Sequence, residues 1–223
     1  MSPTTKQRSD YTFKYNEKLG RHGWLRLTPA YSVKLVKELV EETPKNSMIL
    51  DPFSGTATTG VVAAELGMDA HLFDINPFLI WLGNVKCRSF KSNEIENIKN
   101  EILPKIMSDY REFALVNNWS PNIHNIERWW CGHTLPLISA LRSAIVKNCG
   151  NPKGTSAKNL VWVAFMRLII ETSSAAFNHV SMSFKGGVTR FEIDQIQEIF
   201  NSILENILHS SAQPLKGKAK VFL

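Results

Sequence analysis

Two acidic residues and the small-residue turn after the first of them carry the strongest chemical signal in the sequence. Asp51 ends an apolar run and opens the string DPFSGTATTG, and Asp74 ends the next apolar run, 23 residues later. A turn from a strand into a helix presents free backbone N–H groups and a positive helix end, and Gly55 permits an unusual backbone path. An acid at the end of the second strand typically bonds ribose hydroxyls in nucleotide-binding α/β folds. The pattern therefore favours a ligand crevice, with an ordinary turn capped by two acids as the alternative. The turn lacks the full GxGxxG spacing, which disfavours a nicotinamide cofactor.

Alternating short strands and helices are expected to position these residues. Apolar runs predict strands at Met48–Leu50 and Ala70–Phe73, and a third strand at 219–223. Helices are predicted at Thr58–Leu66, with Gly67 as its cap, and from Pro77 to about Cys87. This order predicts parallel strands joined by right-handed crossovers, an α/β arrangement.

Helices dominate the rest of the chain. We expect them at residues 31–42, 93–117, 135–148, 156–173 and 191–208, with Pro104 breaking or kinking the second. The first 30 residues read as irregular, and the serine-rich stretch 173–187 reads as a loop. We therefore predict an α/β lobe over 1–90, a helical insertion over 91–213, and a strand returning to the sheet over 214–223.

Composition limits the class of protein. The 223 residues are 43% hydrophobic and carry a net charge of +6, which supports a real core and suits a polyanion-binding face without proving one. The three cysteines, Cys87, Cys131 and Cys149, are too few for a disulfide framework, and no signal peptide is visible, so a cytoplasmic location is expected. Cys131 and His133 lack two further ligands nearby, so no metal site is predicted.

Three stretches together point to one enzyme family. DPFSGTATTG resembles the S-adenosylmethionine-binding motif of DNA amino-methyltransferases, which methylate exocyclic nitrogens of adenine or cytosine. LFDINPFLIWLGNVK is similar to their second motif, and WLRLTPAYSVKLVKELV is similar to the segment that precedes the first motif in members with permuted order. The resemblance covers residues 21 to 88 and implies part of a Rossmann-like methyltransferase sheet. Ala57 stands where the family usually has glycine.

The resemblance implies a set of residues that bind S-adenosylmethionine. They are Thr28, Pro29, Ala30, Asp51, Phe53, Ser54, Gly55, Asp74, Ile75 and Asn76. In this reading Asp51 meets the amino end of the ligand, Asp74 binds the ribose hydroxyls, and the two residues after Asp74 flank the adenine. The first three close the methionine side, although a plain helix start explains Thr28 and Pro29 equally well. Phe53, Ser54 and Gly55 line the ligand.

The family's catalytic motif has no counterpart in this sequence. That motif is Asp, Asn or Ser followed by Pro-Pro and an aromatic residue, and it grips the flipped base so that its amino nitrogen faces the methyl group. The sequence contains no Pro-Pro, and its nearest string, Asn76–Phe78, belongs to the second motif. We therefore assign no catalytic residue and expect a donor-binding half. A second polypeptide, or a continuation absent from this chain, would complete it.

Basic and aromatic residues of the insertion are candidates for contact with DNA. Arg128, Lys185 and Arg190 would neutralise phosphates, and Trp129 and Trp130 would stack on an unpaired base. The alternative is that the tryptophans are core and the charges only solvate the surface. The hypothesis is a subunit of a DNA amino-methyltransferase of a restriction–modification system. It is expected to bind S-adenosylmethionine weakly or not at all by itself and to methylate nothing. The alternative is a non-catalytic, methyltransferase-like regulatory protein.

Overall fold

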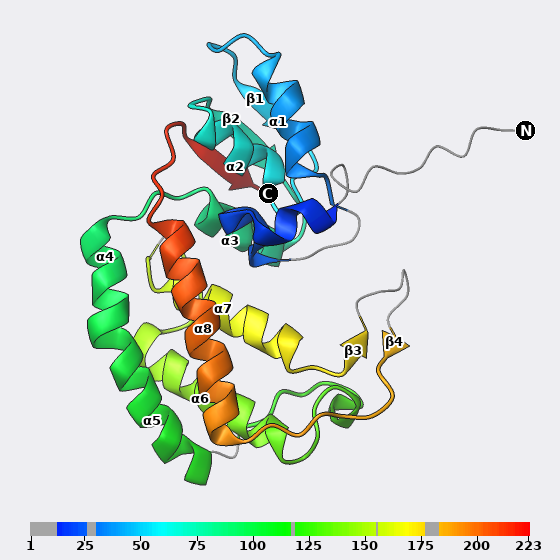
Figure 1. Ribbon diagram of the computed structural model, residues 1–223, viewed down its shortest axis with the longest axis vertical. Coiled ribbons are helices and arrows are strands. Elements are labelled where there is room, and N and C mark those ends of the chain that lie inside the picture. The colour runs from blue at the N-terminus through cyan, green and yellow to red at the C-terminus, as the bar shows by residue number, and fades with distance from the viewer. Residues whose placement is uncertain (1–12, 26–29, 117–118, 155, 177–182) are drawn as a thin grey trace, which may run out of the picture. The chain divides into compact units, whose positions relative to one another are not determined.

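The structure is a computed structural model, and it divides the chain into two compact units (Figure 1). It describes residues 13–25, 30–116, 119–154, 156–176 and 183–223. The first unit is Met1–Phe90 together with His209–Leu223, and the second is Lys91–Leu208. The function that the sequence assigns to each part stays a prediction.

A three-stranded parallel sheet forms the centre of the first unit. Its strands β1 (Ile49–Asp51), β2 (Ala70–Phe73) and β5 (Ala219–Phe222) lie in the order β1-β2-β5, and both pairings are parallel. The predicted parallel pairing of the three strands is confirmed, and the unit is of α/β type. The carboxyl ends of β1 and β2, where Asp51 and Asp74 lie, meet at one edge of the sheet.

Three helices accompany this sheet: α1 (Val33–Glu41), α2 (Thr58–Glu65) and α3 (Pro77–Lys86). Val33, Val36 and Val40 of α1 belong to the same buried cluster as the residues of α2, β2 and β5 that face it. Ser32 caps α1 by accepting the Lys34 N–H at 3.2 Å, as the sequence predicts for a helix entry.

Two glycines allow α2 and α3 to approach the strands closely. A Cβ on Gly60 would lie 2.7 Å from a methyl group of Leu72, and one on Gly83 would lie 2.6 Å from a methyl group of Val221. Leu72 and Val221 are partners in the β2–β5 register, so their side chains share one face of the sheet. Both helices therefore cover the same face.

The N-terminal segment is more regular than the sequence predicts. It forms two 3₁₀ helices, η2 (Phe13–Lys18) and η3 (Gly20–Trp24). Asn16 holds them against α1, because its amide donates to the Tyr31 carbonyl at 2.8 Å and its oxygen accepts the Val33 N–H at 2.8 Å. These partners lie 15 and 17 residues away, so local sequence patterns do not reveal the order.

In the second unit, Pro104 was expected to break or kink its helix, and the helix is not broken there. α4 (Ser92–Asn97) continues through a π-helical turn, η4 (Ile98–Ile102), into α5 (Leu103–Val116), where Pro104 stands second. Proline lacks the N–H of an ordinary helical residue, and a π turn alters the hydrogen-bond ladder just where that N–H is missing. The predicted helix is present, with a change of winding next to the proline at which a break or a kink was expected.

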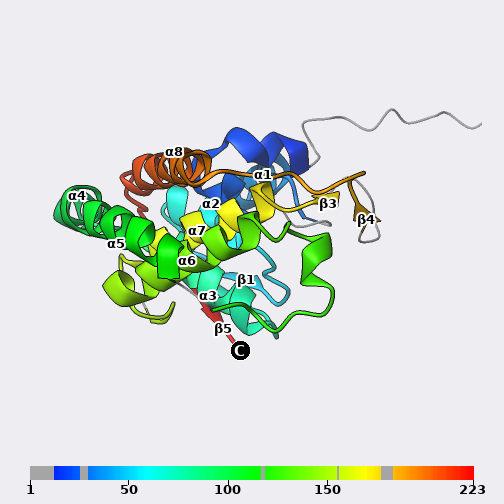
Figure 2. The same ribbon diagram turned by 90° about the horizontal axis from the view of Figure 1, so that it is seen from below.

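Further helices complete the second unit. They are the 3₁₀ turn η5 (Ile126–Arg128), α6 (Thr134–Cys149), α7 (Asn159–Glu171) and α8 (Ile193–Ser211), whose last turn belongs to the first unit. α5 packs along α6, and α6 packs against α7 (Figure 2). Residues 159–166 of α7 are all buried, as its apolar composition predicts. None of the helices in the described ranges is long and apolar enough to cross a membrane.

A short β-hairpin replaces part of the loop expected at 173–187. Strands β3 (Ala175–Ala176) and β4 (Ser183–Phe184) pair antiparallel, so the loop prediction is wrong for these four residues. The Lys185 N–H extends the pairing by donating to the Ser174 carbonyl at 2.8 Å. Residues 177–182 between the strands lie outside the described residues.

Candidate functional site

The turn between β1 and α2 is fastened to the end of the neighbouring strand. The Ser54 N–H donates to the Phe73 carbonyl at 2.9 Å, and the Gly55 N–H donates to Asp74 Oδ2 at 3.0 Å. The turn closes on itself through the Ala57 N–H, which donates to the Ser54 carbonyl at 2.7 Å. β2 therefore fixes the path of the turn at two successive residues.

Both Gly55 and Ala57 adopt a left-handed backbone conformation, with φ of 49° and 59°. Glycine adopts it without strain, whereas for alanine it costs about 1–2 kcal/mol. The position at which the resembling family usually has glycine is thus one where the backbone favours glycine. Ala57 keeps the same path here, and its fully buried methyl group offsets part of the strain.

The two acids predicted to bind the ligand also organise the backbone. Asp51 Oδ1 accepts the Phe53 N–H at 3.0 Å, which is a local turn contact. Asp74 accepts the Gly55 N–H on one oxygen and the Asn76 N–H on the other at 2.8 Å, so it joins the β1–α2 turn to the β2–α3 turn. A carboxylate oxygen has two lone pairs, so these bonds leave Asp74 able to accept a ligand hydroxyl.

A cavity of about 450 Å³ lies over the β1–α2 turn. It is lined by Ala30, Tyr31, Phe53, Ser54, Gly55, Thr56, Thr58 and Thr59. Four of the ten predicted ligand residues, Ala30, Phe53, Ser54 and Gly55, thus line one cavity. Thr28 and Pro29 lie outside the described residues, so their predicted role stays a prediction.

Unsatisfied polar groups face or adjoin this cavity. The hydroxyl oxygen of Ser54 is buried without a hydrogen-bond partner, although Ser54 is only 6% exposed. No side chain caps the start of α2, where Ala57 holds the N-cap position. Helix N-termini carry free N–H groups and a partial positive charge. The cavity therefore combines a buried hydroxyl with the positive end of a helix.

The remaining predicted residues lie beside the cavity at the second turn. Asn76 Oδ1 caps α3 by accepting the Phe78 N–H at 3.0 Å. Ile75 is 91% exposed, and Phe53, on the rim of the cavity, is 82% exposed. Large apolar side chains this exposed, close to Asp51 and Asp74, form a surface suited to a flat ligand or to another polypeptide.

Sequence reasoning assigned no role to a lysine beneath the turn. Lys86, the last residue of α3, is fully buried, and its Nζ donates to the Thr56 carbonyl at 2.6 Å. Burial lowers its pKa to about 8, although nearby Cys87 and Glu65 act to raise it. Its sequence signal is the spacing from Gly83: residues three apart share a helix face, and Gly83 lies against Ala57 of the same turn.

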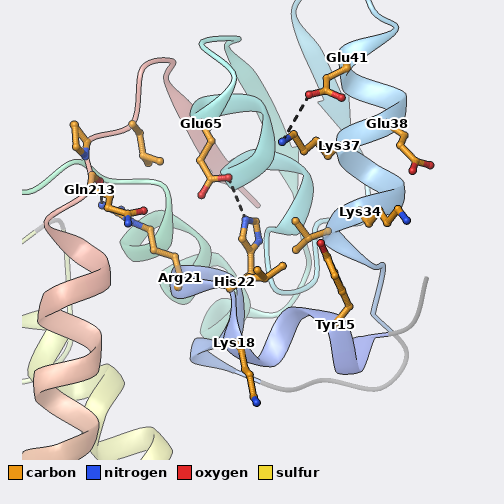
Figure 3. A pocket seen from close by; sticks show the side chains of 15 residues that line it. Tyr15, Lys18, Arg21, His22, Lys34, Lys37, Glu38, Glu41, Glu65 and Gln213 are labelled. Atoms are coloured by element: carbon orange, nitrogen blue, oxygen red, sulfur yellow. Dashed lines mark hydrogen bonds and ion pairs between the residues drawn. The ribbon is translucent and has the colours of Figure 1, made fainter. Parts of the chain in front are cut away.

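A second, larger cavity in this unit was not predicted. It has a volume of about 670 Å³, and Figure 3 shows side chains from η2, η3, α1 and α2 around it. Charged groups here pair with one another: Lys37 lies 3.8 Å from Glu41, and His22 Nε2 lies 3.5 Å from Glu65. His22 Nδ1 is buried without a partner, and burial lowers the pKa of this histidine.

Arg21, which also lines the larger cavity, has a structural role. Its guanidinium donates to the carbonyls of Lys86 and Arg88 at the end of α3, and to those of Ser211 and Gln213 at 2.8 and 2.9 Å. Free carbonyls at helix ends need such donors. Burial lowers the pKa of Arg21 to about 10. One guanidinium thus binds four carbonyls. Arg21 therefore holds the ends of α3 and α8 together at the border of this cavity.

The predicted DNA contacts fall in two places of the second unit. The Arg128 guanidinium lies 4.3 Å from the ring centre of Phe184, next to exposed Lys185, and Trp129 packs edge-on against Phe184 at 5.1 Å. Arg190 pairs with Glu192 at 2.9 Å. No cluster of three or more potential metal ligands occurs within the described ranges.

Comparison with known proteins agrees with the geometry of the first unit. Residues 5–84 match a family model described as DNA methylase, and this segment includes β1, α2, β2 and both acids. The type II methyltransferase M.BsoBI of Geobacillus stearothermophilus is 37% identical over 68 residues. That match covers 30% of this chain and 13% of the relative, so the chain matches a small part of a longer protein. No solved structure matches the chain. The first unit is thus similar to a segment of DNA methyltransferases, and the matched family generally uses S-adenosylmethionine.

Proposed function

We propose that this chain is the donor-binding half of a DNA amino-methyltransferase from a restriction–modification system, and that a second chain carrying the catalytic motif completes it. The observation that carries the proposal is the cavity over the β1–α2 turn. It lies within the segment that matches the DNA methylase family and has a buried, unpaired hydroxyl in its wall.

The residues around this cavity suit S-adenosylmethionine. The uncapped start of α2 offers hydrogen-bond donors for the oxygen atoms of the ligand, and Ser54 lies in the wall of the cavity. Asp74 offers acceptors for ribose hydroxyls, and Asp51 for the amino group. Ile75 and Phe53 offer apolar surface for the adenine. When bound, S-adenosylmethionine supplies an electrophilic methyl group, and this chain holds and orients it.

The machinery for the target base would come from elsewhere. The sequence holds no Pro-Pro, and the nearest candidate, Asn76–Phe78, already has a different use. Asn76 Oδ1 accepts the Phe78 N–H at the start of α3, so that side chain is fixed as a helix cap. This occupied role supports the assignment of the catalytic motif to another polypeptide.

One face of the sheet offers a place for that polypeptide. Leu50 is 66% exposed and Phe73 37% exposed, and the ring of Phe222 lies beside Phe73 with centroids 5.6 Å apart. Sheets of parallel strands are ordinarily covered on both faces. β1 also pairs with β2 alone among the described strands, which leaves its other backbone edge available for a further strand. Both features support completion of this sheet by a second chain.

DNA contact is proposed for the second unit. Arg128 and Lys185 flank Phe184, which places two cations beside an aromatic ring. Cations neutralise phosphates, and aromatic rings stack on unpaired bases. Arg190 is the weaker candidate of the three, because Glu192 already pairs with its guanidinium.

Methyl transfer from labelled S-adenosylmethionine to duplex DNA tests the division of labour. We expect no transfer by this chain alone, and transfer once a second chain with a Ser-Pro-Pro-Tyr-like motif is added. Robust transfer by the isolated chain would contradict the division into two chains. Donor binding without transfer in every combination would favour a non-catalytic regulatory protein.

The two acids that flank β2 provide a matched pair of variants for donor binding. Asp74 follows the strand and accepts the Gly55 N–H; Asp69 precedes it and accepts the Lys218 N–H at 2.7 Å. Asp74→Asn and Asp69→Asn therefore disturb comparable backbone bonds at opposite ends of one strand. We expect only Asp74→Asn to weaken S-adenosylmethionine binding, by about tenfold or more in calorimetry. Equal weakening by both variants would count against the site.

A further inference from the structure

Lys86 stands out because a complete side chain with an amine at its tip is buried inside the first unit. Its exposed fraction is 0%, and it belongs to the last turn of α3, where lysines usually remain at the surface to interact with free carbonyls. Its Nζ instead lies 2.6 Å from the carbonyl oxygen of Thr56, 30 residues earlier in the chain. Burial of an amine is costly, so this contact requires an explanation.

The Thr56 carbonyl needs a donor that the turn itself does not supply. Thr56 precedes the N-cap residue Ala57, so its carbonyl lies outside the hydrogen-bond ladder of α2, which begins when Ala57 accepts the Val61 N–H. Thr56 is only 7% exposed, and an unpaired buried carbonyl costs about 1–3 kcal/mol. Lys86 satisfies this carbonyl from below the turn.

The bond also fixes the direction of one peptide plane. Carbonyl and N–H point in opposite directions across a trans peptide, so holding the Thr56 carbonyl toward Lys86 directs the Ala57 N–H toward the Ser54 carbonyl, which it reaches at 2.7 Å. The left-handed φ of Ala57 is strained for alanine, and the Lys86 bond restrains the peptide just before it. Ser54 and the start of α2, which face or adjoin the cavity, lie on either side of the fixed peptide.

We propose that Lys86 is the positioning residue of the donor turn, by which we mean the β1–α2 turn over residues 52–57: it holds the Thr56–Ala57 peptide so that Ser54 stays in the wall of the ligand cavity and the start of α2 faces that cavity. This inference rests on the proposed function for its ligand, but the contact with the turn is independent of any ligand. Lys86 acts through Thr56 and Ala57 and does not line the cavity.

The protonation of Lys86 provides a probe in the unmodified protein. Burial lowers its pKa to about 8, while Arg21 titrates at about 10 and Cys87 at about 12. The pKa of His22 is lowered from 6.5, and so is that of Glu65 from 4.5, because its bond to His22 and nearby positive charges outweigh its burial. Between about pH 7 and 9, Lys86 is thus the group expected to titrate among those beside it on α2, α3 and η3.

The first experiment follows amide NMR signals of the full chain through this pH range. We expect the Ala57 amide to shift with the same midpoint, near pH 8, as the Cε signal of Lys86. Turn amides that ignore the titration of Lys86 would overturn the proposal. This measurement needs neither a ligand nor a variant.

The second experiment compares substitutions. Lys86→Met removes the donor and keeps the shape of the chain, and Lys158→Met is the matched control, because Lys158 Nζ donates to the Asn148 carbonyl at 2.9 Å in the second unit. In Lys86→Met we expect amide exchange at residues 54–59 to be about tenfold faster and S-adenosylhomocysteine binding to be about tenfold weaker. Lys158→Met leaves both unchanged, and Lys86→Arg restores part of each.

The outcomes separate this inference from the proposed function. If S-adenosylhomocysteine fails to bind the wild type while exchange in the turn still depends on Lys86, the ligand assignment fails and the positioning role stands. If the ligand binds equally to wild type and Lys86→Met, the positioning role fails and the ligand assignment stands. Should Lys86→Met fail to fold, the titration in the wild type decides.

Discussion

The two faces of the small parallel sheet differ in what covers them. On one face Ala70, Leu72 and Val221 are at most 2% exposed beneath α2 and α3. On the other, Leu50 and His71 are exposed, and Phe73 is 37% exposed. These residues alternate along the same strands, so the contrast does not come from one region being more polar than another.

The contrast shows that one face of the sheet is packed as a core, while the other face leaves apolar side chains exposed between polar ones. The covered face is packed as tightly as a domain interior. Gly60 and Gly83 leave room there for the methyl groups of Leu72 and Val221. The open face presents the aromatic pair Phe73 and Phe222. Its exposure is one of the reasons for our proposal that a second chain packs there.

The largest expected effect separates neighbours on β2. Leu72→Ala removes a fully buried side chain and is expected to lower the free energy of unfolding by about 2–5 kcal/mol. Phe73→Ala, on the open face, is expected to cost about 1 kcal/mol, mainly through its ring contact with Phe222. Denaturant unfolding of both variants measures the difference, and equal losses would contradict the contrast between the faces.

A smaller effect is expected where α3 meets the covered face. In Gly83→Ala the new methyl group would lie 2.6 Å from Val221 and 3.1 Å from Ala57, so overpacking is expected to cost about 1–3 kcal/mol. Gly132→Ala is the control, because a Cβ there meets nothing within 4 Å. A thermal unfolding midpoint for Gly83→Ala as high as that of the control would show that α3 does not pack tightly on the sheet.

The buried amine of Lys86 predicts that the free energy of unfolding depends on pH. The pKa of Lys86 is lower in the fold than its usual 10.5, so the unfolded chain binds more protons between about pH 8 and 10.5, and stability rises with pH there. Between about pH 7 and 9, wild type should gain about 1 kcal/mol relative to Lys86→Met. The comparison cancels Cys87, whose raised pKa acts in the opposite direction above pH 9. A flat difference would contradict the burial of a titrating amine.

The smallest effect on stability is expected from the open face itself. Leu50→Ser should change the free energy of unfolding by less than about 0.5 kcal/mol, because Leu50 is 66% exposed. The same variant should bind less of the dye 8-anilinonaphthalene-1-sulfonate, which adheres to apolar surfaces. A large loss of stability would mean that this face is already packed.

Strands and helices were predictable where the sequence has a regular apolar pattern with glycine or proline at its ends. The strand Ala70–Phe73 agrees residue for residue, and helix α2 differs from its prediction only at the last residue, because apolar runs, Gly67 and Pro77 mark local boundaries. The 3₁₀ helices of the N-terminal segment were missed, since Asn16 and its partners are far apart in the chain. The helix continues through Pro104 without the break that was one of the two predicted outcomes, because a π turn stands next to the proline.

The candidate site also has one part that the sequence predicts and one part that it does not. The turn with Gly55 and the acids at the strand ends follow from local patterns, and the structure brings Ser54, Gly55 and Asp74 together. The burial of Lys86 was not predicted, because a lysine in the last turn of a helix is ordinarily a surface residue and its spacing from Gly83 is a weak signal against that expectation. Its contact with Thr56 depends on how α3 packs beneath the turn.

The most direct test of the central claim is a map of amide NMR shifts in the full chain during titration with S-adenosylmethionine. The account predicts weak but saturable shifts concentrated at residues 53–59 and 74–76, around the cavity and the two acids. Shifts confined to the larger cavity around His22 or to the second unit would contradict it.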